Sequence, residues 1–269
     1  MDLELTDRVI VVTGGSSGVG LALVNDLLSC GARVATCARD LDRLDAATSA
    51  LDGHDPDRLL TMACDVRLAG QVDRFIAATH ERFGAVDGLV NNAGQSLMRG
   101  FADTAFDEWM SEFELKFAGV IHPVTAARNY LAASDAGVVV NVNAVLARQP
   151  EPRLAATSAA RAGLLNLTRT LASDLGPEGI RVNSVLLGLI DTGQWRRRFD
   201  QRSDDQRGDD VEQSWEEWSA AIAADRGITL GRLGTAREVS YVITMLLSPR
   251  ASYVTGTSID VAGGVGRYV

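Results

Sequence analysis

Short runs of β-branched residues alternate with longer stretches of helical periodicity along the 269-residue chain, and this alternation constrains the fold most. Such a pattern is typical of βαβ units, in which helices connect the parallel strands of one sheet. The expected strands are residues 8–13, 32–38, 59–64, 86–91, 137–142, 180–186 and 257–262. The expected helices are residues 18–30 and stretches near 40–51, 68–83, 104–133, 152–176 and 236–248. The sequence therefore predicts an α/β fold with a parallel sheet and helices on both of its faces.

Composition and charge exclude several classes of function. The net charge is −9 at pH 7, whereas a nucleic-acid surface needs clustered lysine and arginine. No apolar run reaches the roughly 18 residues of a membrane span, and the first residues lack the pattern of a signal peptide. The cysteines Cys30, Cys37 and Cys64 do not have the spacing of a metal site or a disulfide framework. We expect a soluble cytoplasmic protein with no nucleic-acid partner, no membrane partner and no metal.

A glycine-rich turn, TGGSSGVG at 13–20, follows the first expected strand and opens the first helix. Glycines in this context let the backbone approach a pyrophosphate, and the helix N-terminus offers free N–H groups to it. The strand-turn-helix context makes the motif more specific than a lone glycine cluster, although a purely structural turn remains an alternative. The predicted cofactor-binding residues of the turn are Gly14, Ser16, Ser17, Gly18, Val19 and Gly20.

The end of the second strand bears on the choice between NADP(H) and NAD(H). An NAD site usually places Asp or Glu there to bind the ribose 2′-hydroxyl. This chain has Ala38 and then Arg39, and a guanidinium suits a 2′-phosphate. Asp40, one residue further, is expected to cap the next helix. The sequence favours NADP(H), with NAD(H) the less favoured cofactor; the alternative is that Arg39 is a solvated surface charge.

Several motifs in order resemble those of the short-chain dehydrogenase/reductase family, especially its ketoacyl-carrier-protein-reductase-like members. They are TGGSSGVG, CDV at 64–66, NNAG at 91–94, IRVNSVLLGLIDT at 180–192 and TGTSIDVAGG at 255–264. The resemblance covers nearly the whole chain. It implies a single Rossmann-type domain over residues 1–269, with a doubly wound sheet of about seven strands, and a homotetramer or homodimer. It further implies that the cofactor contacts Asp65, Val66, Asn92, Ala93, Gly94, Ile190 and Thr192.

The four catalytic residues of that family, Asn, Ser, Tyr and Lys, are all replaced here. Counting seven residues from Trp109 puts Lys116 at the Asn position, and the Tyr and Lys positions are Thr157 and Arg161. Ala144, thirteen residues before Thr157, stands at the Ser position, beside Asn143. The spacings of thirteen and four residues are intact, so the sequence predicts a site with altered chemistry rather than a shifted alignment.

The replacements remove the family's proton-transfer groups. A threonine hydroxyl is a far weaker acid than a phenol, whose pKa is about 10, and an arginine with pKa above ~12 cannot relay a proton. Arg161 is still expected to hydrogen-bond the cofactor ribose. Asn143 is a candidate oxyanion donor through its amide. Lys116 is a candidate acid, base or nucleophile if it faces the cleft; the alternative is an i,i+4 pair with Glu112 on the helix surface.

Residues 193–230 are the expected substrate lid. The segment 201–210 contains no apolar residue and is expected to be a mobile loop. Val211, Trp215, Trp218 and Ile222 then follow the spacing of one amphipathic helix face, which packs on the domain, a neighbouring subunit or a ligand. The run Arg196, Arg197 and Arg198 suits an acidic or CoA-like small-molecule substrate, or is a solvated face.

Two functions remain open from the sequence. The first is an atypical NADP(H)-dependent oxidoreductase with a rebuilt active site, in which Lys116 or water supplies the proton. The second is a nucleotide-binding pseudoenzyme, or a non-redox isomerase or lyase, on the same fold. Fold alone does not choose between them. The retained cofactor motifs favour the oxidoreductase, and the sequence does not name the substrate.

Overall fold

A seven-stranded parallel sheet forms the centre of the computed structural model, which describes residues 2–201 and 213–266. The strand order is β3-β2-β1-β4-β5-β6-β9, and every pair is parallel. The strands are β1 Val9–Thr13, β2 Arg33–Ala38, β3 Leu59–Ala63, β4 Gly88–Asn91, β5 Val138–Ala144, β6 Arg181–Leu187 and β9 Ser258–Val261. The chain reverses its direction across the sheet between β1 and β4, which is the switch point of a doubly wound fold. The predicted fold class is confirmed.

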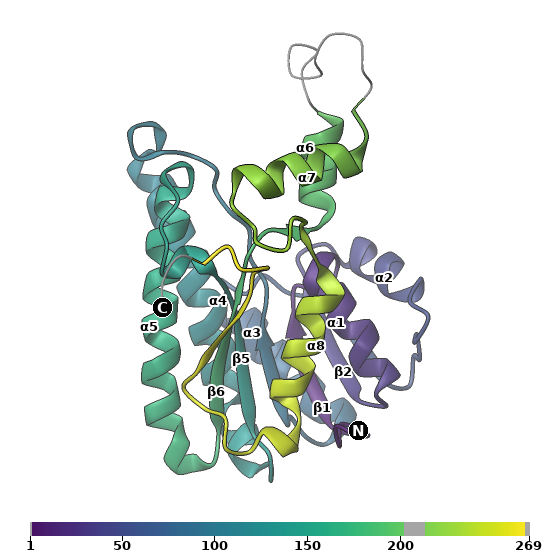
Figure 1. Ribbon diagram of the computed structural model, residues 1–269. Coiled ribbons are helices and arrows are strands. Elements are labelled where there is room, and N and C mark those ends of the chain that lie inside the picture. The colour runs from purple at the N-terminus through teal and green to yellow at the C-terminus, as the bar shows by residue number, and fades with distance from the viewer. Residues whose placement is uncertain (1, 202–212, 267–269) are drawn as a thin grey trace.

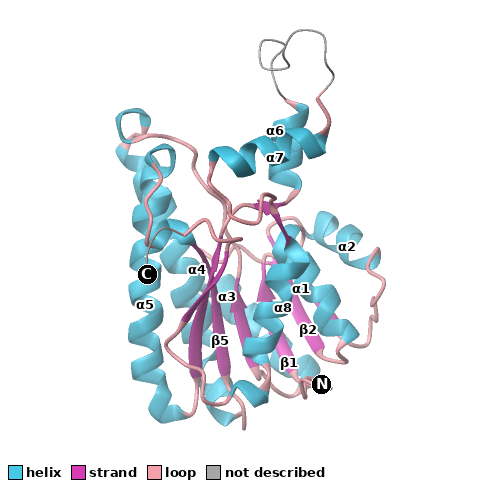
Figure 2. Cartoon of the chain, in the orientation of Figure 1, coloured by secondary structure: helices cyan, strands magenta, loops and turns pink. Residues whose placement is uncertain are grey.

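Helices cover both faces of the sheet (Figures 1 and 2). Helices α1 (Gly18–Ser29) and α8 (Ala236–Leu247) pack on one face, with α2 (Leu41–Ser49) beside α1. Helices α3 (Ala69–Phe83), α4 (Phe106–Ala133) and α5 (Ala155–Leu175) pack on the other. Each face therefore has its own apolar core, and the central strands are buried on both sides. This burial explains why these strands read as continuous apolar runs rather than alternating ones.

Helix starts follow the local capping chemistry. The Asp40 side chain accepts a hydrogen bond from the Arg43 N–H at 3.0 Å and caps α2, which confirms the predicted cap. Helix α5 begins at Ala155 rather than near 152, because Pro152–Leu154 form a separate 3₁₀ turn.

A two-stranded sheet of β7 (Ile190–Asp191) and β8 (Gly234–Thr235) was not predicted, since strands of two residues carry no periodicity.

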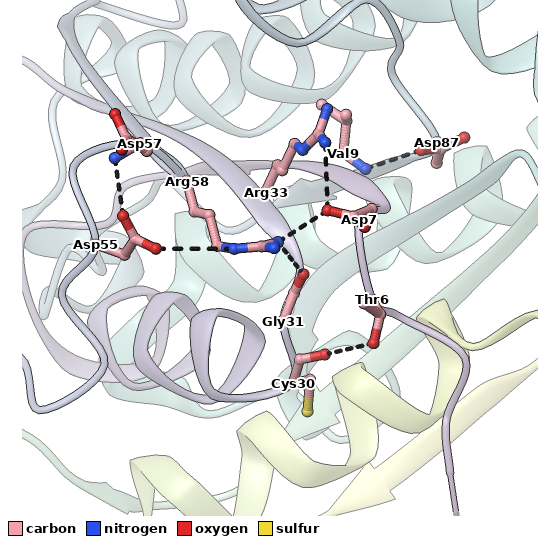
Figure 3. A network of polar contacts seen from close by, with 10 residues as sticks. All are labelled: Thr6, Asp7, Val9, Cys30, Gly31, Arg33, Asp55, Asp57, Arg58 and Asp87. Carbon is pink, nitrogen blue, oxygen red and sulfur yellow. Dashed lines mark hydrogen bonds and ion pairs between the residues drawn. The ribbon is translucent and has the colours of Figure 1, made fainter.

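Polar contacts hold the amino ends of the strands together (Figure 3). Asp7 accepts hydrogen bonds from Arg33 at 3.3 Å and from Arg58 at 3.0 Å, and these arginines lie at the starts of β2 and β3. The Val9 N–H donates to the Asp87 carboxylate at 2.8 Å, just before β4. Exposed ion pairs of this kind contribute little stability each. These contacts lie at the amino ends of the strands, and the candidate site lies at the opposite, carboxyl ends.

Two helices stand above the carboxyl edge of the sheet, α6 (Gly193–Asp200) and α7 (Trp215–Asp225) (Figure 1). The tryptophans of α7 pack as the amphipathic pattern predicts: Trp215 and Trp218 contact one another at 5.5 Å between ring centroids, and both contact Phe199 of α6. Trp215 and Ile222 also pack against a small core with Val145 and Leu186. The predicted mobile loop, apart from Gln201, and Val211 lie outside the described residues. None of the described helices is long and apolar enough to cross a membrane.

Candidate active site

The glycine-rich turn connects β1 to α1 at the carboxyl edge of the sheet. Gly14 and Gly18 have positive φ values of 76° and 56°, which side chains rarely tolerate. A Cβ on Gly20 would lie 2.2 Å from the Gly14 carbonyl oxygen, so glycine is required there by space. The Ser17 side chain makes no capping hydrogen bond to α1, and no acidic residue occupies the first turn of that helix. The helix N-terminus thus keeps uncapped N–H groups and fits a pyrophosphate.

Asn92 fixes this turn from the end of β4. Its Nδ2 donates to the carbonyls of Thr13 at 2.9 Å and Gly14 at 3.1 Å. The Thr13 hydroxyl in turn accepts from the N–H groups of Asn92 and Ala93, both at 3.0 Å. The Asn92 amide therefore positions the glycine turn, which is a structural role that the sequence did not predict.

The expected adenosine end of the cofactor site lies past β2 and β3. Arg39 follows β2 and is exposed. Asp65 follows β3 and accepts hydrogen bonds from Arg67, at 3.0 Å from Nε and 2.5 Å from Nη2, which lower the pKa of Asp65. Arg39 is close enough to lower that pKa as well. Val66 is buried beside Asp65.

The two remaining predicted contacts lie at the base of α6. Ile190 is buried in β7, and Thr192 is the N-terminal flanking residue of α6. A Cβ on Gly18 would lie 3.5 Å from the Thr192 Cγ2 atom. The structure therefore brings the start of the expected lid against the glycine turn.

Lys116 of α4 points toward the cofactor motif at the end of β4. Its Nζ donates to the Gln95 carbonyl at 2.6 Å and would lie 3.9 Å from a Cβ on Gly94. The Glu112 carboxylate lies 3.5 Å from the same Nζ, so the predicted i,i+4 pair exists. The expected surface position of this pair is wrong, because both side chains are only 4% exposed. They are buried because α5 packs against α4 and covers this face.

Thr157 of α5 completes the cluster around Glu112. Its hydroxyl donates to the Glu112 Oε2 atom at 2.6 Å, and the Thr157 hydroxyl oxygen itself accepts from the Leu97 N–H at 3.1 Å. Thr157 is fully buried. Because its proton is directed at a carboxylate, this hydroxyl orients Glu112.

Arg161 lies one turn further along α5. Its Nη1 is 3.5 Å from the Asn143 Oδ1 atom, and its buried Nε has no hydrogen-bond partner. An unpaired buried donor is costly, and this one fits the ribose hydroxyl oxygens of a bound dinucleotide. The Asn143 amide donates to the Arg161 carbonyl at 3.1 Å, and Asn143 is fully buried. This geometry does not favour the predicted oxyanion role of Asn143, which instead orients Arg161. Ala144, at the end of β5, contributes no polar side chain.

Burial lowers the pKa values of the two basic groups. Burial, with a smaller effect of nearby Arg161, lowers the pKa of Lys116 from 10.5 to about 8, and Glu112 partly opposes that shift. Burial also lowers the pKa of Arg161 to about 10, so its guanidinium remains charged at neutral pH. Lys116 is therefore the group of this cluster that can both release and accept a proton near neutral pH.

Two signals for this cluster were missed in the sequence. Lys116 is the single lysine of the chain, and the other 25 of the 26 basic residues are arginine. An ammonium shifts its pKa readily on burial, whereas a guanidinium does not relay protons, so the one lysine is a candidate for proton chemistry. The sequence suggests Glu112 only as a partner of Lys116 on the helix surface. Its spacing placed it beside Lys116, but only the packing of α5 on α4 shows that the carboxylate is inside.

Comparisons with known proteins agree with this architecture. Residues 8–203 match the family described as short chain dehydrogenase. Sorbitol-6-phosphate 2-dehydrogenase of Klebsiella pneumoniae is 33% identical, with 98% of each chain covered. Levodione reductase of Leifsonia aquatica is 31% identical, covering 97% of this chain and 95% of the relative.

Solved structures give a more similar neighbour. A short chain oxidoreductase of Pseudomonas aeruginosa PAO1, described as containing an atypical catalytic center, is 48% identical in its apo form. Its TM-score is 0.93, with 98% of this chain and 99% of that chain covered. The NADPH-bound form of that protein is 47% identical, with a TM-score of 0.90 and coverage of 98% and 100%. By sequence match and by structure, this chain belongs to the short-chain dehydrogenase/reductase family of oxidoreductases.

Proposed function

We propose that this protein is an NADP(H)-dependent oxidoreductase that reduces a small carbonyl compound and uses Lys116 in place of the family's tyrosine. The observation that carries the proposal is the buried amine itself. It is the single lysine of the chain, its pKa is about 8, and its Nζ lies beside the Gly94–Gln95 backbone. The related Pseudomonas protein with an atypical center binds NADPH, which supports the same cofactor here.

The residues that would hold the cofactor are those of the glycine turn, with Arg39 at the 2′-phosphate and Arg161 at the ribose. When bound, NADPH supplies the hydride that reduces the carbonyl carbon. The chain itself supplies the proton. Lys116 donates it from Nζ to the carbonyl oxygen, because a group with a pKa near 8 is mostly protonated at pH 7 yet gives up its proton readily.

Two neighbours keep the amine in place for that step. The Gln95 carbonyl and the Glu112 carboxylate occupy two of its hydrogen-bond directions. The third N–H direction is the one left for a substrate oxygen. Thr157 holds Glu112 through its 2.6 Å hydrogen bond, and burial, with a smaller effect of the Arg161 charge, keeps the pKa of Lys116 low.

The cofactor preference is tested by replacing Arg39 with alanine. We expect NADPH to bind the wild type more tightly than NADH, because Arg39 meets the 2′-phosphate and Ala38 puts no carboxylate beside it. In Arg39→Ala the NADPH affinity should fall by about 10- to 100-fold, the effect of one charge-assisted contact, while NADH affinity stays unchanged. Titration of intrinsic tryptophan fluorescence measures both affinities. Equal losses of affinity for NADPH and NADH would mean that Arg39 does not contact the 2′-phosphate.

The reductase activity is tested by following NADPH absorbance with a panel of small ketones, keto acids and ketoacyl thioesters. We expect at least one of them to be reduced, with NADP⁺ formed in equal amount to alcohol. Tight NADPH binding with no consumption on any compound, by a folded protein, would contradict the proposal and favour a nucleotide-binding protein without redox activity.

A further inference from the structure

Two arginines of the 193–230 segment contact stretches of chain that are hydrogen-bonded to the α5 residues Thr157 and Ser158. Arg198 of α6 contacts the Met98 sulfur, and Met98 follows Leu97, whose N–H donates to Thr157. Arg226, just after α7, forms a 2.6 Å ion pair with Glu151. The Glu151 N–H in turn donates to the hydroxyl of Ser158, the neighbour of Thr157 in α5, at 3.2 Å. Each guanidinium therefore contacts a residue one step removed from Thr157: Met98 adjoins its partner Leu97, and Glu151 is bonded to its neighbour Ser158.

Arg198 differs from the other arginines of its helix. It is half-buried, and its guanidinium carbon lies 4.6 Å from the centre of the Trp195 ring. Within residues 2–201 and 213–266, no carboxylate pairs with it, whereas Arg196 pairs with Asp191 at 2.8 Å. Burial and the nearby Arg226 charge both lower the pKa of Arg198. A partly desolvated guanidinium is unfavourable unless an anion joins it.

From this arrangement we infer that the substrate carries an oxyanion group, a carboxylate or a phosphate, which Arg198 binds with the help of Arg226. A guanidinium on an aromatic face presents two parallel N–H groups, the geometry that carboxylates and phosphates accept. In the neighbouring cluster the two cations, Lys116 and Arg161, outnumber the one carboxylate, Glu112, in a chain whose net charge is −9. The inference rests on the proposed reductase function, since it names the class of its substrate.

Anion binding is measured without turnover. The wild type is titrated with inorganic phosphate and, separately, with succinate, at an ionic strength held constant with potassium chloride, and tryptophan fluorescence is recorded. Trp195, stacked against Arg198, makes that signal sensitive to the subsite. We expect saturable binding of at least one anion, weakened about 10- to 100-fold in Arg198→Gln. The anion that binds with the higher affinity identifies the substrate group as a phosphate or a carboxylate.

The matched control is Arg197→Gln, which removes the same charge from an exposed position of the same helix. It should bind the anion like the wild type. Arg226→Gln is the second variant, expected to weaken binding less because Glu151 already neutralises Arg226. Circular dichroism and NADPH titration check that each variant is folded. Equal losses in Arg197→Gln and Arg198→Gln, or no saturable binding at all, would overturn the inference.

Turnover assays then test the anionic substrate class and the reductase activity as two separate claims. Dihydroxyacetone phosphate is compared with dihydroxyacetone, and acetoacetate with methyl acetoacetate, by NADPH oxidation. We expect the charged member of one pair to have the higher kcat/KM, and Arg198→Gln to remove that preference. Saturable, Arg198-dependent anion binding without any turnover would support the subsite and contradict the reductase. Equal turnover of charged and uncharged ketones would support the reductase and overturn the anionic substrate.

Discussion

Replacing Lys116 by methionine is expected to lower kcat/KM for NADPH-dependent carbonyl reduction by roughly 10²–10⁴-fold, the usual contribution of one general acid. Methionine keeps the length and much of the apolar stem of lysine but has no proton to give. NADPH affinity should stay close to that of the wild type, because the glycine turn and Arg161 are untouched. NADPH absorbance measures the rate, and calorimetry measures cofactor binding.

Two further variants make this result interpretable. Lys116→Arg keeps the charge but not the proton transfer, so it should be as slow as Lys116→Met. The double variant Lys116→Met with Glu112→Gln avoids leaving a buried carboxylate without its cation, which would otherwise destabilise the fold. In the wild type, reduction requires the protonated amine, so kcat/KM should be constant below pH 8 and fall above it. A wild-type rate in Lys116→Met would assign the proton to another group.

The second large effect is expected from Gly20→Ala. The new Cβ would lie 2.2 Å from the Gly14 carbonyl oxygen and 2.5 Å from the Asn92 Nδ2 atom. Neither neighbour can retreat, since Gly14 is backbone at a tight turn and Asn92 fixes that turn. The turn must then shift, and we expect NADPH affinity to fall by about 100-fold or more, about 2.7 kcal/mol. Calorimetric titration with NADPH measures the loss.

Gly70→Ala, in the first turn of α3, is the matched control for that change. A Cβ there would approach only the flexible Arg74 side chain, at 3.8 Å, and Gly70 is exposed. This variant should bind NADPH like the wild type and unfold at a similar temperature. Normal NADPH binding by Gly20→Ala would show that the turn does not form the pyrophosphate site.

The fold was predictable because its signals are local. Seven apolar runs became the seven parallel strands, and Asp40 began its helix where its side chain could cap it. The errors lie where tertiary contacts decide. Pro152–Leu154 form a 3₁₀ turn rather than the start of α5, and β7 pairs with β8 across about 40 residues of sequence.

The site was only partly predictable for the same reason. Spacing placed Glu112 one turn from Lys116, but it is the packing of α5 that buries both and brings Thr157 to within 2.6 Å of the carboxylate. The direction of the Asn143 amide, toward the Arg161 carbonyl, depends on how β5 meets α5, which no motif encodes. The cofactor turn was easier to read, because its glycines are required by backbone geometry within eight consecutive residues.

Measuring the pKa of Lys116 tests the proposed proton transfer most directly, and the composition of the chain makes this measurement possible. Because Lys116 is the single lysine, protein grown with isotope-labelled lysine gives one side-chain resonance by nuclear magnetic resonance, with no assignment problem. Its chemical shift is followed from pH 6 to pH 11. We expect a titration midpoint at a pKa of about 8, the same pH at which kcat/KM begins to fall. A midpoint near the ordinary lysine value of about 10.4 would contradict the proposed proton transfer, because the amine would then be too weak an acid for that step.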